Sequence, residues 1–210
     1  MKAFCITIKG HKDSEELSLN CLKTAAEVGG LDEVTIFDAS TPKDKPFEVL
    51  ESMNLSISNK MRINPDKRSI DAQCACFLSH YRLWQKTVEL DENVLVLEHD
   101  SIFVAPMPDI TFDYLVNLGK PSYGMKRYRK ANGSGLQPFS HAHLNGTHGY
   151  AITPAGAQRC LKDIKQKGVW AAVDVALSAR WIQEYHPWPI EANSYFSTIQ
   201  YNNYISAEEK

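Results

Sequence analysis

The chain has 210 residues, of which 43% are hydrophobic and 23% charged, and its formal net charge is −2. This composition suits one α/β domain with a full hydrophobic core and excludes extensive disorder. The near-neutral charge gives no overall attraction to nucleic acid or to an anionic membrane. No apolar run is long enough to span a bilayer. We expect a single domain over residues 1–205, a tail at 206–210, and a cytoplasmic location that allows peripheral contact with a membrane.

The first part of the chain alternates strands and helices. Residues 3–8 form a β-branched run that predicts a strand, and residues 33–37 predict a second one. Between them, residues 13–28 have helical spacing and end at two glycines. A strand, a helix and a strand in this order indicate a parallel βαβ unit. The sequence therefore predicts an α/β fold.

The strongest helical pattern lies in the middle of the chain. Residues 69–90 carry one apolar stripe at helical period, with Ser69 as the N-cap. The preceding residues 41–66 are polar and rich in prolines, which predicts a loop with one short helix at 46–53. Residues 94–97 are fully apolar and follow a polar turn, as is typical of a central parallel strand buried on both faces. A short extended piece is expected at 102–104.

The last part of the chain is less regular. Residues 120–146 are rich in Gly, Ser, Pro, His and basic residues, and we expect a long loop that closes when a ligand binds. Residues 147–153 predict a strand. Thr153 should then cap a helix that has proline at its first position and ends at Gly168. A last helix is expected over residues 174–184.

Two carboxylates follow the buried strand, at the edge where sites form in open α/β sheets. In an extended backbone, residues two apart point the same way, so Glu98 and Asp100 should face one point while His99 points away. Oxygen ligands suit Mg²⁺ or Mn²⁺, which can hold a diphosphate as it departs from a sugar. The pattern thus favours metal-dependent sugar transfer over an acidic turn that only solubilises the strand end.

Residues 75–104, ACFLSHYRLWQKTVELDENVLVLEHDSIFV, resemble glycosyltransferase family 25. Its members include lipopolysaccharide galactosyl- and glucosyltransferases and collagen galactosyltransferases. The shared pattern is a cysteine, Ser-His and Trp on a helix, followed by an apolar strand that closes on three acidic residues. The matching residues here are Cys76, Ser79, His80, Trp84 and Glu98-His99-Asp100, with histidine in place of the middle acid. Weaker similarities follow at residues 149–161 and at Asp174.

The resemblance implies a GT-A (Rossmann-like) fold, with a mixed, mostly parallel sheet and helices on both faces. It implies inverting transfer of a hexose, galactose or glucose, from a UDP-sugar to an acceptor hydroxyl of lipopolysaccharide or another surface glycan. Asp100 and Glu98 are expected to bind Mn²⁺ or Mg²⁺, and Asp174 is expected to be the general base. The expected donor-binding residues are Ser79, His80, Glu98, Asp100 and Asp38.

Two other functions stay open. The same chemistry could act on modified DNA or on protein, which the basic, aromatic residues between 120 and 130 permit. The chain could instead be a non-catalytic module that binds a sugar nucleotide. Glu184 and Glu191 are reserves for the general base. Additional candidate ligands for the metal or the diphosphate are His141, His143, His148 and His186. The five cysteines form no C-x-x-C pair, and we expect free, buried thiols.

Overall fold

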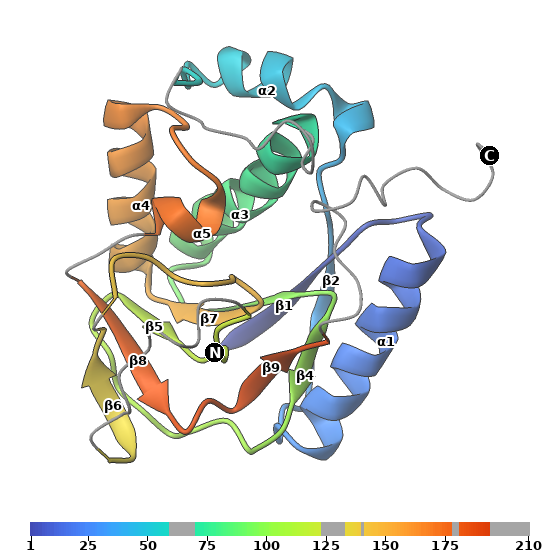
Figure 1. Ribbon diagram of the computed structural model, residues 1–210, viewed down its shortest axis with the longest axis vertical. Helices are drawn as coiled ribbons and strands as arrows, with labels where there is room; N and C mark the ends of the chain where they lie inside the picture. Colours follow the sequence, from blue (N-terminus) through green and yellow to red (C-terminus); the bar gives the residue numbers. More distant parts are fainter. Residues whose placement is uncertain (59–69, 123–132, 140, 178–180, 194–210) are drawn as a thin grey trace.

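A computed structural model describes residues 1–58, 70–122, 133–139, 141–177 and 181–193 (Figure 1). In this part of the chain, seven strands form one sheet in the order β2-β1-β3-β7-β5-β8-β6. These strands are β1 (Lys2–Thr7), β2 (Thr35–Asp38), β3 (Val94–Glu98), β5 (Leu115–Asn117), β6 (Gly135–Pro138), β7 (Gly149–Ile152) and β8 (Ile182–His186). A second, two-stranded sheet pairs β4 (Ser101–Phe103) with β9 (Ile190–Ala192).

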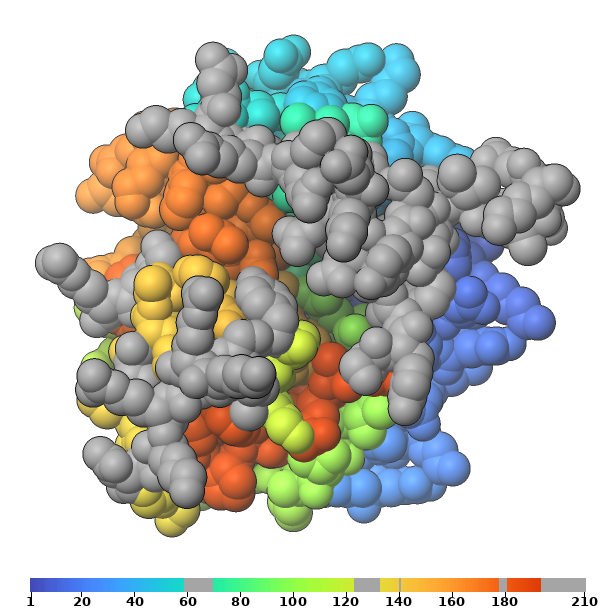
Figure 2. Space-filling model, in the orientation of Figure 1, coloured from blue at the N-terminus to red at the C-terminus, as the bar shows by residue number. Residues whose placement is uncertain are grey.

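Helices cover both faces of the large sheet. They are α1 (Lys12–Glu27), α2 (Pro46–Ser52), α3 (Ile70–Leu90), α4 (Pro154–Lys167) and α5 (Val173–Ala176), with a 3-10 turn, η1, at Pro42–Asp44. Side chains of β1 alternate between the two faces, as in any strand. Phe4 and Ile6 pack in one core with α3 and α4, whereas Ala3 and Cys5 pack in a second core with α1. In the space-filling view, α1 (blue) and α4 (orange) lie on opposite flanks (Figure 2).

The order of the strands places a crossover beside β1. This strand runs parallel to β2 on one side and to β3 on the other, so the chain crosses β1 on its way from β2 through α3 to β3. β7 is antiparallel to both β3 and β5, β5 is parallel to β8, and β6 is antiparallel to β8. The result is an α/β fold with a mixed sheet, a parallel core and helices on both faces, which confirms the predicted Rossmann-like class.

Most elements with a regular sequence pattern form where they were predicted. β1, α1, β2, α2, α3, β3 and β7 all overlap their predicted ranges. Thr153 is the N-cap of α4, and its Oγ1 accepts a hydrogen bond from the Gly156 N–H; Gly168, where φ is 73°, is the C-cap. Within the described residues, no helix is both long and apolar enough to cross a membrane.

Three predictions about the elements were wrong. The helix expected over residues 174–184 does not form, because α5 stops at Ala176 and Ile182–His186 is the strand β8. The β8 side chains alternate between buried and half-buried, which is the period of a strand and not of a helix. β3 is central, but it is parallel only to β1 and is antiparallel to β7. The loop predicted over residues 120–146 contains the strand β6. Ser69 and the tail at 206–210 lie outside the described residues.

Candidate functional site

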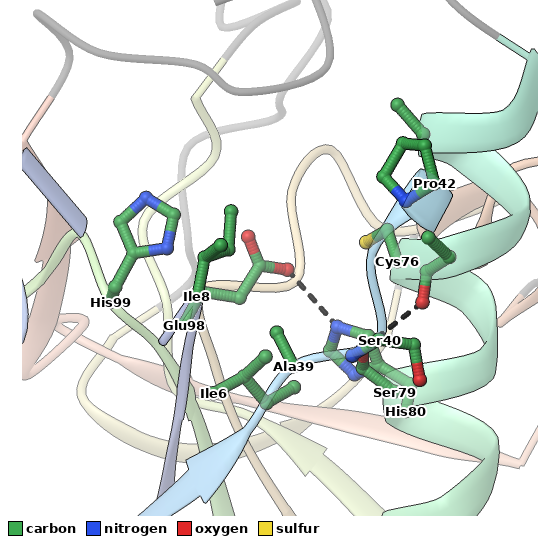
Figure 3. Close-up of a pocket in the computed structure, with 12 residues that line it drawn as sticks. Ile6, Ile8, Ala39, Ser40, Pro42, Cys76, Ser79, His80, Glu98 and His99 are labelled. Carbon is green, nitrogen blue, oxygen red and sulfur yellow. Dashed lines mark hydrogen bonds and ion pairs between the residues drawn. The ribbon is translucent and has the colours of Figure 1, made fainter. Parts of the chain in front are cut away.

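A small cavity lies against α3, at the carboxyl ends of β1 and β3 (Figure 3). Its polar lining consists of Ser40, Cys76, Ser79, His80, Glu98 and His99. Ile6 of β1 and Ile8, just after that strand, belong to its apolar lining. The volume is about 60 Å³, enough for a cation with a few waters but far below the roughly 300–1,000 Å³ of a complete ligand pocket. The cavity sits at the switch point of the sheet, where open α/β folds bind ligands.

A buried chain of hydrogen bonds leads from the core to Glu98. The Trp84 Nε1–H donates to the Tyr150 hydroxyl at 2.9 Å, and that hydroxyl lies 3.0 Å from His80 Nδ1. Because the Tyr150 oxygen already accepts from Trp84, its own proton is available to Nδ1. With Nδ1 accepting, Nε2 carries the ring proton and donates it to Glu98 Oε1 at 3.2 Å.

Glu98 is ionised in this setting. Burial alone would raise its pKa, but the hydrogen bond from His80, the electrostatic attraction of the nearby imidazoles of His80 and His148, and the hydrogen bond from Thr147 together lower the pKa to about 2. The Thr147 hydroxyl donates to the same oxygen, Oε1, as His80 does. The second carboxylate oxygen points away from His80 (Figure 3). Glu98 therefore offers one fixed negative charge at the end of β3.

The two residues after Glu98 do not follow the predicted alternation. β3 ends at Glu98 and the backbone turns at His99 and Asp100, so the period of an extended strand no longer applies. His99, which was expected to point away, lines the cavity beside Glu98, whereas Asp100 is outside the lining. Burial lowers the pKa of His99, which favours its neutral form.

Asp100 is half-buried, and one of its carboxylate oxygens, Oδ1, is fully buried. Its Oδ1 has no hydrogen-bond partner among the described residues. Burial, with a further contribution from the charge of Glu98, raises the pKa of Asp100 well above its usual range. A buried carboxylate oxygen without a partner is costly, and a hard divalent cation would relieve that cost. Asp100 Oδ1 and the outward oxygen of Glu98 are thus the candidate oxygen ligands for Mg²⁺ or Mn²⁺.

A second set of possible ligand atoms lies in the cavity itself. One atom each from Cys76, His80 and Glu98 falls within 4.8 Å of the other two. The five cysteines are free, and Cys76 is the one that is partly exposed. Burial raises the pKa of the Cys76 thiol well above its usual range, and the charges of Glu98, Asp174 and Asp100 add to this rise.

Ser79 and Asp38, both predicted to bind the donor, have other partners. Ser79 is fully buried, and its Oγ accepts from the Ser40 N–H at 2.8 Å and donates to the Ala75 carbonyl. It therefore joins α3 to the segment after β2, with only part of its surface on the cavity. The Asp38 side chain is 64% exposed, pairs with Lys9 at 3.7 Å and does not line the cavity.

Asp174 lies in the short helix α5 and is partly buried. Ala172, and not Asp174, is the N-cap of that helix. Asp174 Oδ1 accepts a hydrogen bond from the Val175 N–H at 2.9 Å. Its charge contributes to the raised pKa of Cys76, so Asp174 lies near the cavity lining in an element other than β3.

The remaining candidate ligands are dispersed. His148 is buried with Nδ1 3.3 Å from Ser122 Oγ, and burial lowers its pKa. His186 is buried 3.2 Å from Glu184, and Glu191 pairs with Lys120 at 2.8 Å. His141 and His143 are half-buried in a loop. The other members of the basic, aromatic group, Tyr123, Lys126, Arg127, Tyr128, Arg129 and Lys130, lie outside the described residues.

Comparison with known protein families gives a match over part of the chain. Residues 23–117 match the family model of glycosyltransferase family 25 (LPS biosynthesis protein). The matched range includes α3, β3 and the residues from Ser79 to Asp100, so the resemblance predicted from the sequence is confirmed there. The match supports a glycosyltransferase. None of the curated proteins matches the chain.

Proposed function

We propose that this chain, with its match to glycosyltransferase family 25, transfers a hexose from a UDP-sugar to an acceptor hydroxyl. One observation carries the proposal: the carboxylate of Glu98, whose pKa is lowered, ends a central strand at the switch point of the sheet, and Asp100 follows it with a buried Oδ1 that has no hydrogen-bond partner among the described residues. Nucleotides bind at this position in open α/β folds. The proposed sugar is galactose or glucose, and the proposed acceptor is lipopolysaccharide or another surface glycan.

Each described residue of the site has a proposed task. Asp100 Oδ1 and the outward oxygen of Glu98 hold Mn²⁺ or Mg²⁺, while His80 and Thr147 keep Glu98 ionised and oriented. When bound, the cation supplies positive charge for the departing diphosphate. Because the cavity is small, it would enclose only part of the donor.

Asp174 is the proposed general base of an inverting transfer. Inversion is a single displacement in which the acceptor hydroxyl must lose its proton as the new bond forms. The base has to be separate from the carboxylates that hold the cation, and Asp174 belongs to α5, not to β3 or its turn. Its electrostatic effect on Cys76 supports a position close to the cavity.

A second candidate is a module that binds a sugar nucleotide without turning it over. The observation in its favour is that Glu98 is the only carboxylate in the described lining of the cavity, with His99 beside it. A chain with this lining could bind the donor without catalysing transfer. The experiment therefore measures both donor binding and transfer.

The test incubates the chain with Mn²⁺ and labelled UDP-galactose or UDP-glucose, and follows UDP release with and without a lipo-oligosaccharide acceptor. A transferase releases UDP faster when the acceptor is present, and the label moves to the acceptor. Parallel reactions with hydroxymethylated DNA and with protein distinguish the other acceptor classes. Binding of UDP without release would favour the non-catalytic module. Neither binding nor release would overturn both candidates.

A further inference from the structure

The cavity brings together a thiol and an imidazole, which oxygen-preferring cations do not favour, and one carboxylate. Cys76 and His80 are four residues apart on α3, so both lie on the same face of the helix. Glu98 reaches the same point from the end of β3 (Figure 3). A thiol, an imidazole and a carboxylate are the ligands that Zn²⁺ takes in proteins, whereas Mg²⁺ and Mn²⁺ favour oxygen alone.

The spacing of these atoms is close to that of a tetrahedral site. In a tetrahedral zinc site the Zn–S distance is about 2.3 Å and the Zn–N distance is about 2.0 Å, so two ligand atoms lie roughly 3.3 to 3.6 Å apart. His80 Nε2 and Glu98 Oε1 are already 3.2 Å apart. The Cys76 Sγ lies within 4.8 Å of both, so a small movement of one side chain would complete three ligands. The cavity leaves the fourth position open.

The surroundings already hold His80 as metal-bound histidines are held. Such a histidine makes a hydrogen bond through the nitrogen that does not bind the metal. His80 Nδ1 faces the Tyr150 hydroxyl, which Trp84 fixes in turn. A cation would replace the proton between Nε2 and Glu98, and Nδ1–H would then donate to the Tyr150 oxygen. The cost is that the Tyr150 proton loses its acceptor.

The negative charge near Cys76 works against the thiolate that a cation would bind, unless the cation itself offsets that charge. Glu98, Asp174 and Asp100 all act on the Cys76 thiol. A divalent cation would offset this negative charge and let the thiol ionise, as metal ligation by cysteine requires.

We propose that Cys76, His80 and Glu98 form a binding site for a borderline divalent cation of the Zn²⁺ type. This site differs from the oxygen pair of Glu98 and Asp100, although it shares Glu98 with that pair. The proposal does not depend on the proposed transfer activity, because it follows from the positions of the three ligand atoms alone.

Cobalt is the probe that tests this site, because a thiolate bound to Co²⁺ gives a charge-transfer absorption in the near ultraviolet. Titration of the chain with Co²⁺ should produce this absorption together with the visible bands of a tetrahedral ion. Added Zn²⁺ should abolish both, and an equal amount of Mg²⁺ should not. Absence of the charge-transfer band in the wild-type chain would overturn the proposal.

Matched variants locate the site. Cys76→Ala should lose the charge-transfer band, whereas Cys74→Ala, the same change two residues earlier on α3, should keep it. Asp100→Asn should also keep it, because Asp100 belongs to the oxygen pair. Glu98→Gln should weaken Co²⁺ binding by at least about tenfold. Persistence of the band in Cys76→Ala would contradict the assignment of the ligand.

Thermal melting of each variant shows whether it is folded, and Glu98→Gln gives a second reading of the site if Cys76→Ala does not fold. Transfer activity is measured in the same preparations. If the wild-type chain shows the cobalt band but no transfer, the result contradicts the proposed function and not the metal site. If the wild-type chain shows transfer but no cobalt band, the result contradicts the metal site and not the proposed function.

Discussion

Glu98 is the residue on which the buried polar contacts of the site converge. His80 and Thr147 both donate to its Oε1, and Tyr150 and Trp84 fix His80 from behind. A carboxylate held in this way keeps both its charge and its orientation. Any role in holding a cation requires both.

Asp174→Asn tests the proposed general base. The variant should bind UDP and Mn²⁺ as the wild-type chain does, but kcat should fall by roughly a hundredfold or more, because the acceptor hydroxyl loses its proton acceptor. Asp163→Asn is the control, since Asp163 pairs with Lys167 on the surface of α4. Turnover of Asp174→Asn at the wild-type rate would leave Asp174 with a structural role only.

Two buried histidines predict how stability depends on pH. Burial lowers the pKa of His99 and His148 below the ordinary value of 6.5. Below pH 6.5 the unfolded chain therefore binds more protons than the folded chain. The free energy of unfolding should be highest above this value and fall on acidification. Glu98 adds a second loss of stability below pH 4.5, the ordinary pKa of glutamate, as the pH falls towards its folded pKa of about 2.

Urea denaturation at neutral pH and at about pH 5.5 measures the first of these losses. His148→Gln should lose less stability between the two conditions than the wild-type chain does. His143→Gln, a change at a half-buried position in the same loop region, should behave like the wild type. Equal pH dependence in His148→Gln and the wild type would show that His148 is not responsible.

At the scale of elements, Ser79 joins α3 to the segment that follows β2. Its Oγ accepts from the buried Ser40 N–H, and Arg82 Nη1 donates to the Ser40 hydroxyl from the same helix. Ser79→Ala leaves the Ser40 N–H without this acceptor, so the free energy of unfolding should fall by about 1–3 kcal/mol. Urea denaturation checks this against Ser52→Ala, an exposed control. Equal losses of stability in the two variants would contradict the role of Ser79 in joining α3 to this segment.

Elements with a strong local signal could be predicted from the sequence. The apolar stripe of α3, the apolar run of β3 and the Thr153 cap of α4 each depend on neighbouring residues. β5 is only three residues long, all buried, and this is too short for a period to be recognised. β8 was mistaken for a helix because its inward side chains include Glu184 and His186, which do not resemble a typical buried strand.

The site was predicted less completely, because its contacts join distant parts of the chain. The strand end indicated Glu98, and the family resemblance indicated His80. Neither could reveal Tyr150, which contacts His80 across 70 residues of sequence, or Thr147, which has no motif around it. The alternation that placed His99 away from Glu98 failed because the strand stops one residue earlier than the argument required.

At the scale of the whole molecule, the topology explains why these residues meet. The crossover from β2 to β3 through α3 brings the helix across the ends of β1 and β3. This places Cys76, His80 and Glu98 around one cavity at the carboxyl edge of the parallel core, with α1 on the opposite face. The central claim is that a cation at this edge binds the diphosphate of a nucleotide donor.

Calorimetric titration of UDP, with and without Mn²⁺, tests this claim most directly. The wild-type chain should bind UDP tightly only when Mn²⁺ is present, because the cation links the carboxylates to the diphosphate. Asp100→Asn should remain folded and lose most of the Mn²⁺-dependent binding, while Asp109→Asn, an exposed control, should retain it. Unchanged Mn²⁺-dependent binding of UDP in Asp100→Asn would contradict the account.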